Sequence, residues 1–429
     1  MTEREETVLI DGRTKGIPPG QEPFALAGIG RKGWNVLRED MVLLLAVLKS
    51  AALDHNGRWM RSFLDLTGTA LAPHGKTTMS PDLFARQFAD GAWGLTLATV
   101  QQVRVARAAG IGRIVLANQL VGRQAIGYVA AELAADDGFD FYCLVDSIDG
   151  VEQLAAGLRA SAPGRPLQVM VEVGAAGGRT GCRSDEAALD VARAVRRAEP
   201  RLVLRGVEGY EGMVRGDGDR DGAIRSYLDR IAAVAAGCEA EGLFGPGPVI
   251  LSAGGSAFYD MVAERLGAAE LGRETMVLLR SGCYLTHDSS SYAALFEQVR
   301  QRMPEVDDLG PGPAAALEVW AYVQSRPQPD KAILTVGKRD ISHDAGMPVP
   351  VLWFRPGLHD APAAMPRGAV VTELNDQHAH LSISPESGLR VGDMVALGVS
   401  HPCTTFDKWR VLYVVDDRYD VVSAVTTWF

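Results

Sequence analysis

A lysine beside a histidine and a glycine could bond covalently to a carbonyl compound. Lys76 follows a short apolar run and is preceded by His74 and Gly75. A lysine amine forms an imine only when it is uncharged, so it must be desolvated or flanked by cations, as it can be at the mouth of a β/α barrel. Taken alone, the segment also fits a surface lysine in a loop.

Two glycine-rich segments could bring the backbone close to an anionic or planar ligand. Residues 172–181 carry Arg179 among several glycines, so both backbone and guanidinium can approach such a ligand. Residues 252–256 lead into a predicted helix, whose first N–H groups can bind an anion, and residues 280–284 could close the same site. Taken alone, the first segment also fits a flexible connection.

A possible metal site lies in the last part of the chain. His401 and Cys403 are two residues apart, and in an extended segment such residues face the same way. Imidazole and thiolate together suit zinc. His378 and His380 could add a third ligand or a proton relay, but two ligands alone also fit a structural histidine near a cysteine.

Short aliphatic runs alternate with amphipathic segments and would position these groups. The alternation predicts a parallel sheet, because parallel neighbours need crossover connections. We expect a (β/α)8 TIM-type barrel, with an open doubly wound sheet as the alternative. A further helix is expected within residues 36–53. The predicted strands are Leu66–Ala72, Gly94–Ala98, Arg113–Ala117, Phe141–Val145, Leu167–Val173, Leu202–Val207, Val249–Ser252 and Met276–Arg280.

The pattern changes after about Gly310, where helical periodicity becomes rare and short strands separated by turns take over. This predicts a second, β-rich domain that carries the metal motif. The expected division is a barrel over residues 31–305 and a β-rich domain formed by residues 1–30 and 306–429.

Composition excludes several classes of protein. With 47% hydrophobic and 22% charged residues the chain can bury a full core, and its net charge of −10 argues against a nucleic-acid binder. Neither a membrane span nor a secretory signal is expected. Five scattered cysteines argue against a disulfide framework and favour a cytoplasmic location.

The segment Pro73-His74-Gly75-Lys76-Thr77 resembles the lysine motif of the D-threonine aldolase and D-serine dehydratase family, including its amino acid deaminase subgroup. Members are fold-type III, alanine-racemase-like pyridoxal-phosphate enzymes with a barrel and a β-domain. The resemblance covers about residues 56–428 and includes the histidine–cysteine motif near the end. It implies pyridoxal 5'-phosphate, a divalent metal (Zn²⁺ first, Mg²⁺ or Mn²⁺ as alternatives) and a homodimer.

The resemblance also assigns roles to individual residues. Lys76 would hold the cofactor as a Schiff base, Arg179 would contact its ring, and Tyr210 would be the active-site tyrosine. His401 and Cys403 would bind the metal, and His378 would belong to a further catalytic element. The family histidine after the tyrosine motif is Met213 here, which leaves the substrate open. Other residues expected at the cofactor are His74, Ser252, Gly254, Gly255, Ser256, Gly282 and Tyr284.

The function implied is dehydrative deamination of a β-hydroxy D-amino acid, such as D-serine or D-threonine, to a 2-keto acid and ammonia. The runner-up is aldol cleavage to glycine and an aldehyde; the cysteine in the metal motif favours dehydration. A non-catalytic cofactor carrier and a racemase are further alternatives.

Overall fold

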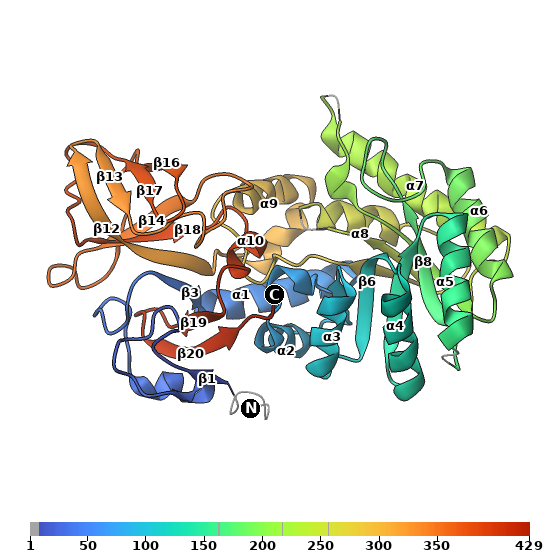
Figure 1. The fold of residues 1–429 in the computed structure, drawn as a ribbon. Coiled ribbons are helices and arrows are strands. Elements are labelled where there is room, and N and C mark those ends of the chain that lie inside the picture. The colour runs from blue at the N-terminus through green and yellow to red at the C-terminus, as the bar shows by residue number, and fades with distance from the viewer. Residues whose placement is uncertain (1–7, 162–163, 217, 256) are drawn as a thin grey trace.

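Eight parallel strands curl into a barrel with helices around it (Figure 1). The structure, a computed structural model, describes residues 8–161, 164–216, 218–255 and 257–429. The barrel strands are β4 (Ala70–Leu71), β5 (Leu95–Leu97), β6 (Arg113–Gln119), β7 (Asp140–Val145), β8 (Leu167–Val173), β9 (Leu202–Gly209), β10 (Val249–Ala253) and β11 (Thr275–Leu279). They lie in the order β4-β11-β10-β9-β8-β7-β6-β5.

The two end strands of this sheet, β4 and β5, are joined by further hydrogen bonds. Trp93 N donates to Leu71 O at 2.7 Å, and Thr96 N donates to Pro73 O at 2.9 Å. The sheet therefore closes on itself, which confirms the predicted TIM-type barrel.

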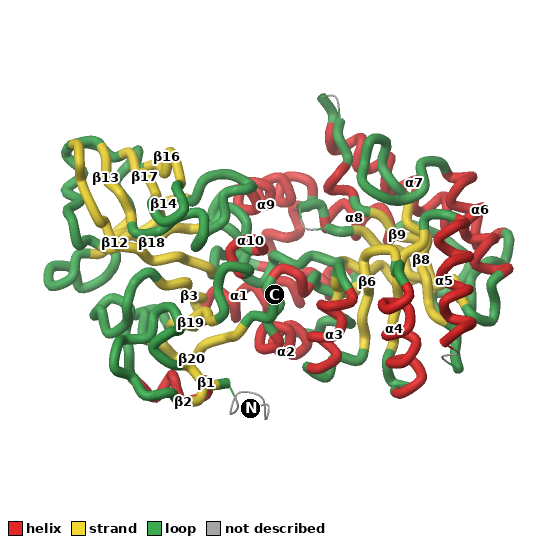
Figure 2. Tube along the Cα trace, in the orientation of Figure 1, coloured by secondary structure: helices red, strands yellow, loops and turns green. Residues whose placement is uncertain are grey.

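Alternation along the strands divides the barrel interior from the layer under the helices. In β8, Met170 belongs to an interior cluster, whereas Val169 and Val171 belong to the core between strands and helices. This is the period of two expected of strands in a small filled barrel. Figure 2 shows the strands inside the ring of helices.

Helices follow the strands as crossover connections, as the sequence predicts. None of the helices in the described part of the chain has the length and apolar character needed to cross a membrane. The helices are α1 (Ser50–Thr67), α2 (Pro81–Ala89), α3 (Val100–Ala108), α4 (Arg123–Ala135), α5 (Ile148–Ser161), α6 (Asp185–Arg197), α7 (Arg220–Ala240), α8 (Tyr259–Gly267), α9 (Ser291–Arg302) and α10 (Cys403–Phe406), with 3₁₀ turns η1 (Leu26–Lys32), η2 (Gly75–Thr77), η3 (Glu211–Met213) and η4 (Pro304–Leu309).

The last part of the chain forms a mainly antiparallel β-rich region beside the barrel (Figure 1). One path of strands runs in the order β15-β14-β18-β12-β13-β17-β16, and β19 pairs with β20. The bounds are β12 (Leu317–Gln328), β13 (Lys331–Leu334), β14 (Val349–Phe354), β15 (Ala363–Ala364), β16 (Val370–Leu374), β17 (Ala379–Ser382), β18 (Met394–Gly398), β19 (Val411–Val415) and β20 (Val421–Thr426). A separate hairpin pairs β1 (Leu9–Ile10) with β2 (Phe24–Ala25).

The helix predicted over residues 36–53 is wrong in its main part. Residues Leu45–Lys49 form strand β3, which lies between β12 and β19 in the β-rich sheet. This run is buried on both faces, so its apolar pattern does not distinguish a strand from a helix. Helix α1 begins only at Ser50 and continues to Thr67, which shortens the predicted first barrel strand to Ala70–Leu71.

The β-rich region packs against the barrel at the segment that follows β4. Trp428 N donates to Met79 O at 2.9 Å, and Thr426 N donates to Asp82 Oδ2 at 3.0 Å. Helix α10, which carries Cys403, lies against η2, which carries Lys76. The exact division of the chain at residues 30 and 306 stays a prediction.

Candidate active site

A cavity of about 240 Å³ lies at the carboxyl end of the barrel strands and collects most of the predicted site residues. Its wall combines loops of the barrel with the segment around α10 from the β-rich region. Active groups of such barrels come from this end of the strands. The predicted residues that line the cavity are His74, Lys76, Arg179, Tyr210, Gly254, Gly282, His401 and Cys403.

Lys76 is presented to the cavity by a tight turn directly after β4. Gly75 permits this turn, because a Cβ there would approach the Phe84 and Leu97 side chains to 3.0 Å. His74 stands beside the lysine, and burial together with the charges of Lys76 and Arg280 holds its pKa well below the usual range. The imidazole is therefore neutral, and its Nδ1 has no hydrogen-bond partner among the described residues.

A buried ion pair, which sequence analysis missed, forms another part of the cavity wall. Arg280, directly after β11, pairs with Glu208 on β9, and its Nη2 donates to Gly209 O at 2.7 Å. Burial raises the pKa of Glu208 to about 7, against the opposing effect of Arg280. Glu172 on β8 lies nearby and accepts from Gln119 Nε2 at 2.5 Å. Charged residues at the ends of apolar strands were the signal that could have revealed this cluster.

The Arg280→Met substitution is expected to lower the free energy of unfolding by about 3–5 kcal/mol, because it leaves the Glu208 carboxylate buried without its partner. A carboxyl whose folded-state pKa is raised binds a proton more readily in the folded state than in the unfolded chain. The loss should therefore be smaller at about pH 6 than at about pH 8. Urea unfolding of the variant and of the unaltered protein at both pH values measures this loss of stability.

The matched control is Arg418→Met, which removes an ion pair whose arginine side chain is 83% exposed. Such pairs contribute about 0–1 kcal/mol. If Arg280→Met loses no more stability than this control, the Arg280–Glu208 pair is not a desolvated one.

Two glycines keep the cavity open next to Tyr210 and Thr77. A Cβ on Gly254 would come to 2.4 Å from Cδ2 of Tyr210, and a Cβ on Gly282 would come to 2.6 Å from Oγ1 of Thr77. The guanidinium of Arg179 lies 5.6 Å from the centroid of the Tyr210 ring. The Tyr210 ring, the Arg179 guanidinium and the glycine backbone together leave room for a planar anionic group.

The neighbouring loop presents a backbone amide to an anionic group. Gly255 N donates to Oε1 of the buried Glu211 carboxylate at 2.7 Å. Glu211 Oε2 has no partner among the described residues. The cavity, whose wall carries the Lys76 amine and the guanidinium groups of Arg179 and Arg280, therefore fits pyridoxal 5'-phosphate.

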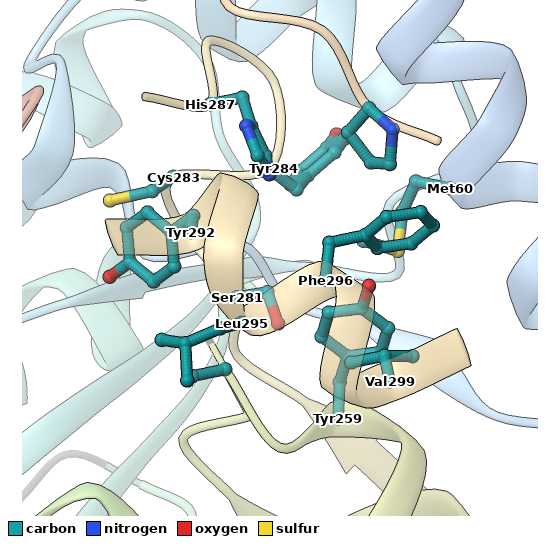
Figure 3. Close-up of a pocket in the computed structure, with 12 residues that line it drawn as sticks. Met60, Tyr259, Ser281, Cys283, Tyr284, His287, Tyr292, Leu295, Phe296 and Val299 are labelled. Atoms are coloured by element: carbon teal, nitrogen blue, oxygen red, sulfur yellow. The ribbon is translucent and has the colours of Figure 1, made fainter. Parts of the chain in front are cut away.

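The prediction for Ser256 falls outside the described residues. Several other predicted residues do not line this cavity. Ser252 is buried, and its Oγ donates to Leu278 O at 2.7 Å. Tyr284 lines a small neighbouring cavity with Met60 and Phe296 (Figure 3). His378 is exposed in the turn between β16 and β17. Their predicted roles therefore receive no support from the geometry of a single chain.

His401 and Cys403 lie together, although not for the reason that the sequence suggested. The segment is not extended, because Cys403 begins the helical turn α10. His401 Nδ1 lies 2.7 Å from Asp344 Oδ2, and Cys403 Sγ lies 3.4 Å from Thr77 Oγ1. Hydrogen bonding to Cys283 and to His401 holds the pKa of the Cys403 thiol well below its usual range, and contact with Cys403 raises the pKa of His401 to about 9.

A thiolate and an imidazole are the ligands that zinc prefers, so the pair fits a divalent metal. Across the described ranges, no group of three or more histidine, cysteine or acidic side chains is already arranged to hold an ion. The histidine–cysteine pair is thus an incomplete ligand set that further groups must complete.

Comparisons with known proteins agree with this architecture. Residues 48–274 match the family described as "Alanine racemase, N-terminal domain", and residues 316–415 match the "Putative serine dehydratase domain". The chain is 28% identical to D-threonine aldolase of Arthrobacter sp over 375 residues, 86% of this chain and 88% of that protein.

Solved structures show the same fold. The crystal structure of D-threonine aldolase from Filomicrobium marinum has a TM-score of 0.73 at 23% identity, covering 92% of this chain and 97% of that one. D-threo-3-hydroxyaspartate dehydratase from Delftia sp. HT23 has a TM-score of 0.69 at 20% identity, covering 92% and 99%. A cysteine-to-alanine mutant of a dehydratase of that name is in the metal-free form. The chain belongs to the alanine racemase N-terminal domain family, as a fold-type III pyridoxal-phosphate protein of the predicted D-threonine aldolase and D-serine dehydratase kind.

Proposed function

We propose that the protein is a pyridoxal-phosphate- and metal-dependent lyase that dehydrates β-hydroxy D-amino acids resembling D-serine or D-threonine to a 2-keto acid and ammonia. The observation that carries this proposal is that Lys76 lines the same cavity as His401 and Cys403. Thr77, the residue after the lysine, lies 3.4 Å from the Cys403 sulfur. One cavity therefore contains both an amine that can act at the α-carbon of a small substrate and two side chains that can bind a metal.

In this proposal Lys76 Nζ would hold the cofactor and, once the substrate amine has replaced it and left it as a free amine, would take the proton from the substrate α-carbon. Bound pyridoxal phosphate supplies an electron sink for the charge left at that carbon. Arg179 orients the ring plane together with Tyr210, which we also propose as a catalytic residue. His74 stays neutral and leaves the positive charge of the site to Arg179 and Arg280.

His401 and Cys403 are proposed to be the residues that would hold the divalent metal at the wall of this cavity. Their nitrogen and sulfur donors favour Zn²⁺ over Mg²⁺ or Mn²⁺. A metal at this place would supply a Lewis acid for the poor leaving group, the β-hydroxyl. Asp344 holds the other ring nitrogen of His401 at 2.7 Å, which fixes the direction of the imidazole.

Aldol cleavage is the second candidate, favoured by the relatives named D-threonine aldolase. It needs the proton of the β-hydroxyl to be removed rather than the hydroxyl itself. The dehydratase relative and the cysteine at position 403, which by the family resemblance accompanies dehydration, favour elimination.

The two activities are separated by their products. We expect incubation with D-serine or D-threonine to give equal amounts of keto acid and ammonia, with little turnover of the L-enantiomers. Glycine and an aldehyde from D-threonine would instead establish the aldolase. Equal turnover of D- and L-serine would contradict the proposed preference for D-substrates.

We further propose that the enzyme acts as a homodimer. Light scattering after size-exclusion chromatography gives the mass of the assembly, and a mass equal to one chain would contradict it.

A further inference from the structure

We propose that the thiolate of Cys283 is a third protein ligand of the metal held by His401 and Cys403, which makes a site of one histidine and two cysteines with a position left for substrate. This inference rests on the proposed function, since it concerns the same metal. It assigns to Cys283 a role that neither its sequence context nor the histidine–cysteine motif indicates.

The distance between the two sulfur atoms suits a shared ion, although His401 and the two sulfurs do not together form a ready three-ligand set among the described residues. Cys283 Sγ lies 3.7 Å from Cys403 Sγ, and both cysteines are free thiols. Two thiolates bound to one tetrahedral zinc, each with a Zn–S bond of about 2.3 Å, stand roughly 3.8 Å apart. The pair also lines the cavity beside Lys76.

The surroundings of the pair come from three separate segments that converge on one point. Cys283 belongs to the loop after β11, Cys403 begins α10, and Thr77 lies in η2. Thr77 Oγ1 is 4.0 Å from Cys283 Sγ and 3.4 Å from Cys403 Sγ. Tyr292 lies beside Cys283 and interacts with its thiol (Figure 3). The thiol is thus held at the wall of the cavity.

His401 has the arrangement of a metal-binding histidine. Its Nδ1 is held by Asp344, whose other oxygen accepts from Thr404 Oγ1 at 2.6 Å. A carboxylate on one ring nitrogen fixes the ring and leaves the second nitrogen for a metal. The ring of His401 also interacts with the side chain of Cys403, so the imidazole and the first sulfur are already in contact.

The remaining cysteines of the chain have no such surroundings. Cys143 and Cys238 pack in the apolar core between strands and helices, and Cys182 Sγ donates to Asp146 O. Only Cys283 and Cys403 line the cavity. Three protein ligands with one open position are the usual form of a catalytic zinc site, and two thiolates select zinc over the harder Mg²⁺ and Mn²⁺.

X-ray absorption at the zinc edge of the zinc-loaded enzyme tests the proposal, because it counts sulfur ligands without relying on activity. We expect two sulfur ligands in the unaltered enzyme and one in Cys283→Ala. Zinc affinity of Cys283→Ala should fall by more than the roughly 10–100-fold that loss of an outer partner costs. Cys238→Ala, which removes a core cysteine, should keep both sulfurs and the affinity.

The outcomes separate this inference from the proposed function. One sulfur ligand in the unaltered enzyme overturns the role of Cys283 and leaves the metal of His401 and Cys403 in place. An unaltered enzyme that binds no zinc overturns both. Because the sulfur count of the unaltered enzyme decides the matter, the test stands even if Cys283→Ala does not fold.

Discussion

Replacing Lys76 by alanine is expected to remove the visible absorption of lysine-bound pyridoxal phosphate and to lower turnover by at least about 10²–10⁴-fold, the usual contribution of a positioned proton-transfer group. The reason is geometric: Lys76 is the only lysine that lines the cavity of the described structure. Absorption spectra of the purified variant, with and without added cofactor, provide the measurement.

The matched control for this variant is Lys338→Ala, which removes an exposed lysine of the β-rich region. Its spectrum and turnover should equal those of the unaltered enzyme. A Lys76→Ala protein that keeps the visible band would refute the assignment of the cofactor lysine.

Removal of the metal is expected to abolish turnover and to leave the cofactor in place. Dialysis against EDTA, or the Cys403→Ala substitution, should lower turnover by at least about a hundredfold, since a ligand matters more than an outer partner. The visible band should persist, because Lys76 and the metal ligands come from different segments. Turnover and absorption are followed on the same sample.

Addition of Zn²⁺ should restore turnover after EDTA treatment but not in Cys403→Ala. Cys238→Ala serves as the control for loss of a thiol elsewhere. Full activity of the EDTA-treated enzyme, with its metal content measured as zero, is the result that would rule out a catalytic metal.

The barrel was predictable from sequence because most of its strands are short aliphatic runs followed by a helix. β8, for example, has the predicted bounds Leu167–Val173. Strand β3 was not predictable in the same way. Its partners β12 and β19 lie far along the chain, so no local pattern records the pairing.

The candidate site was predictable where a motif carries it, as for Lys76, Arg179 and His401. It was not predictable where burial and distant contacts define it. Glu208 lies at the end of an apolar strand, where its charge could have been noticed, but only the fold reveals that Arg280 stands opposite it. Cys283 stands between two predicted residues, yet its relation to Cys403 depends on how the β-rich region packs on the barrel.

The position of β3 has a consequence for how the chain is made. Its residues Leu45, Ala46, Val47 and Leu48 are fully buried between two neighbours that the ribosome completes only after the entire barrel. At about 5–20 residues per second, this apolar strand has to remain unpaired for many seconds, a state prone to wrong pairing. The segment that bears His401 and Cys403 also leaves the ribosome after the barrel, so the two halves of the site can meet only once nearly the whole chain has been made.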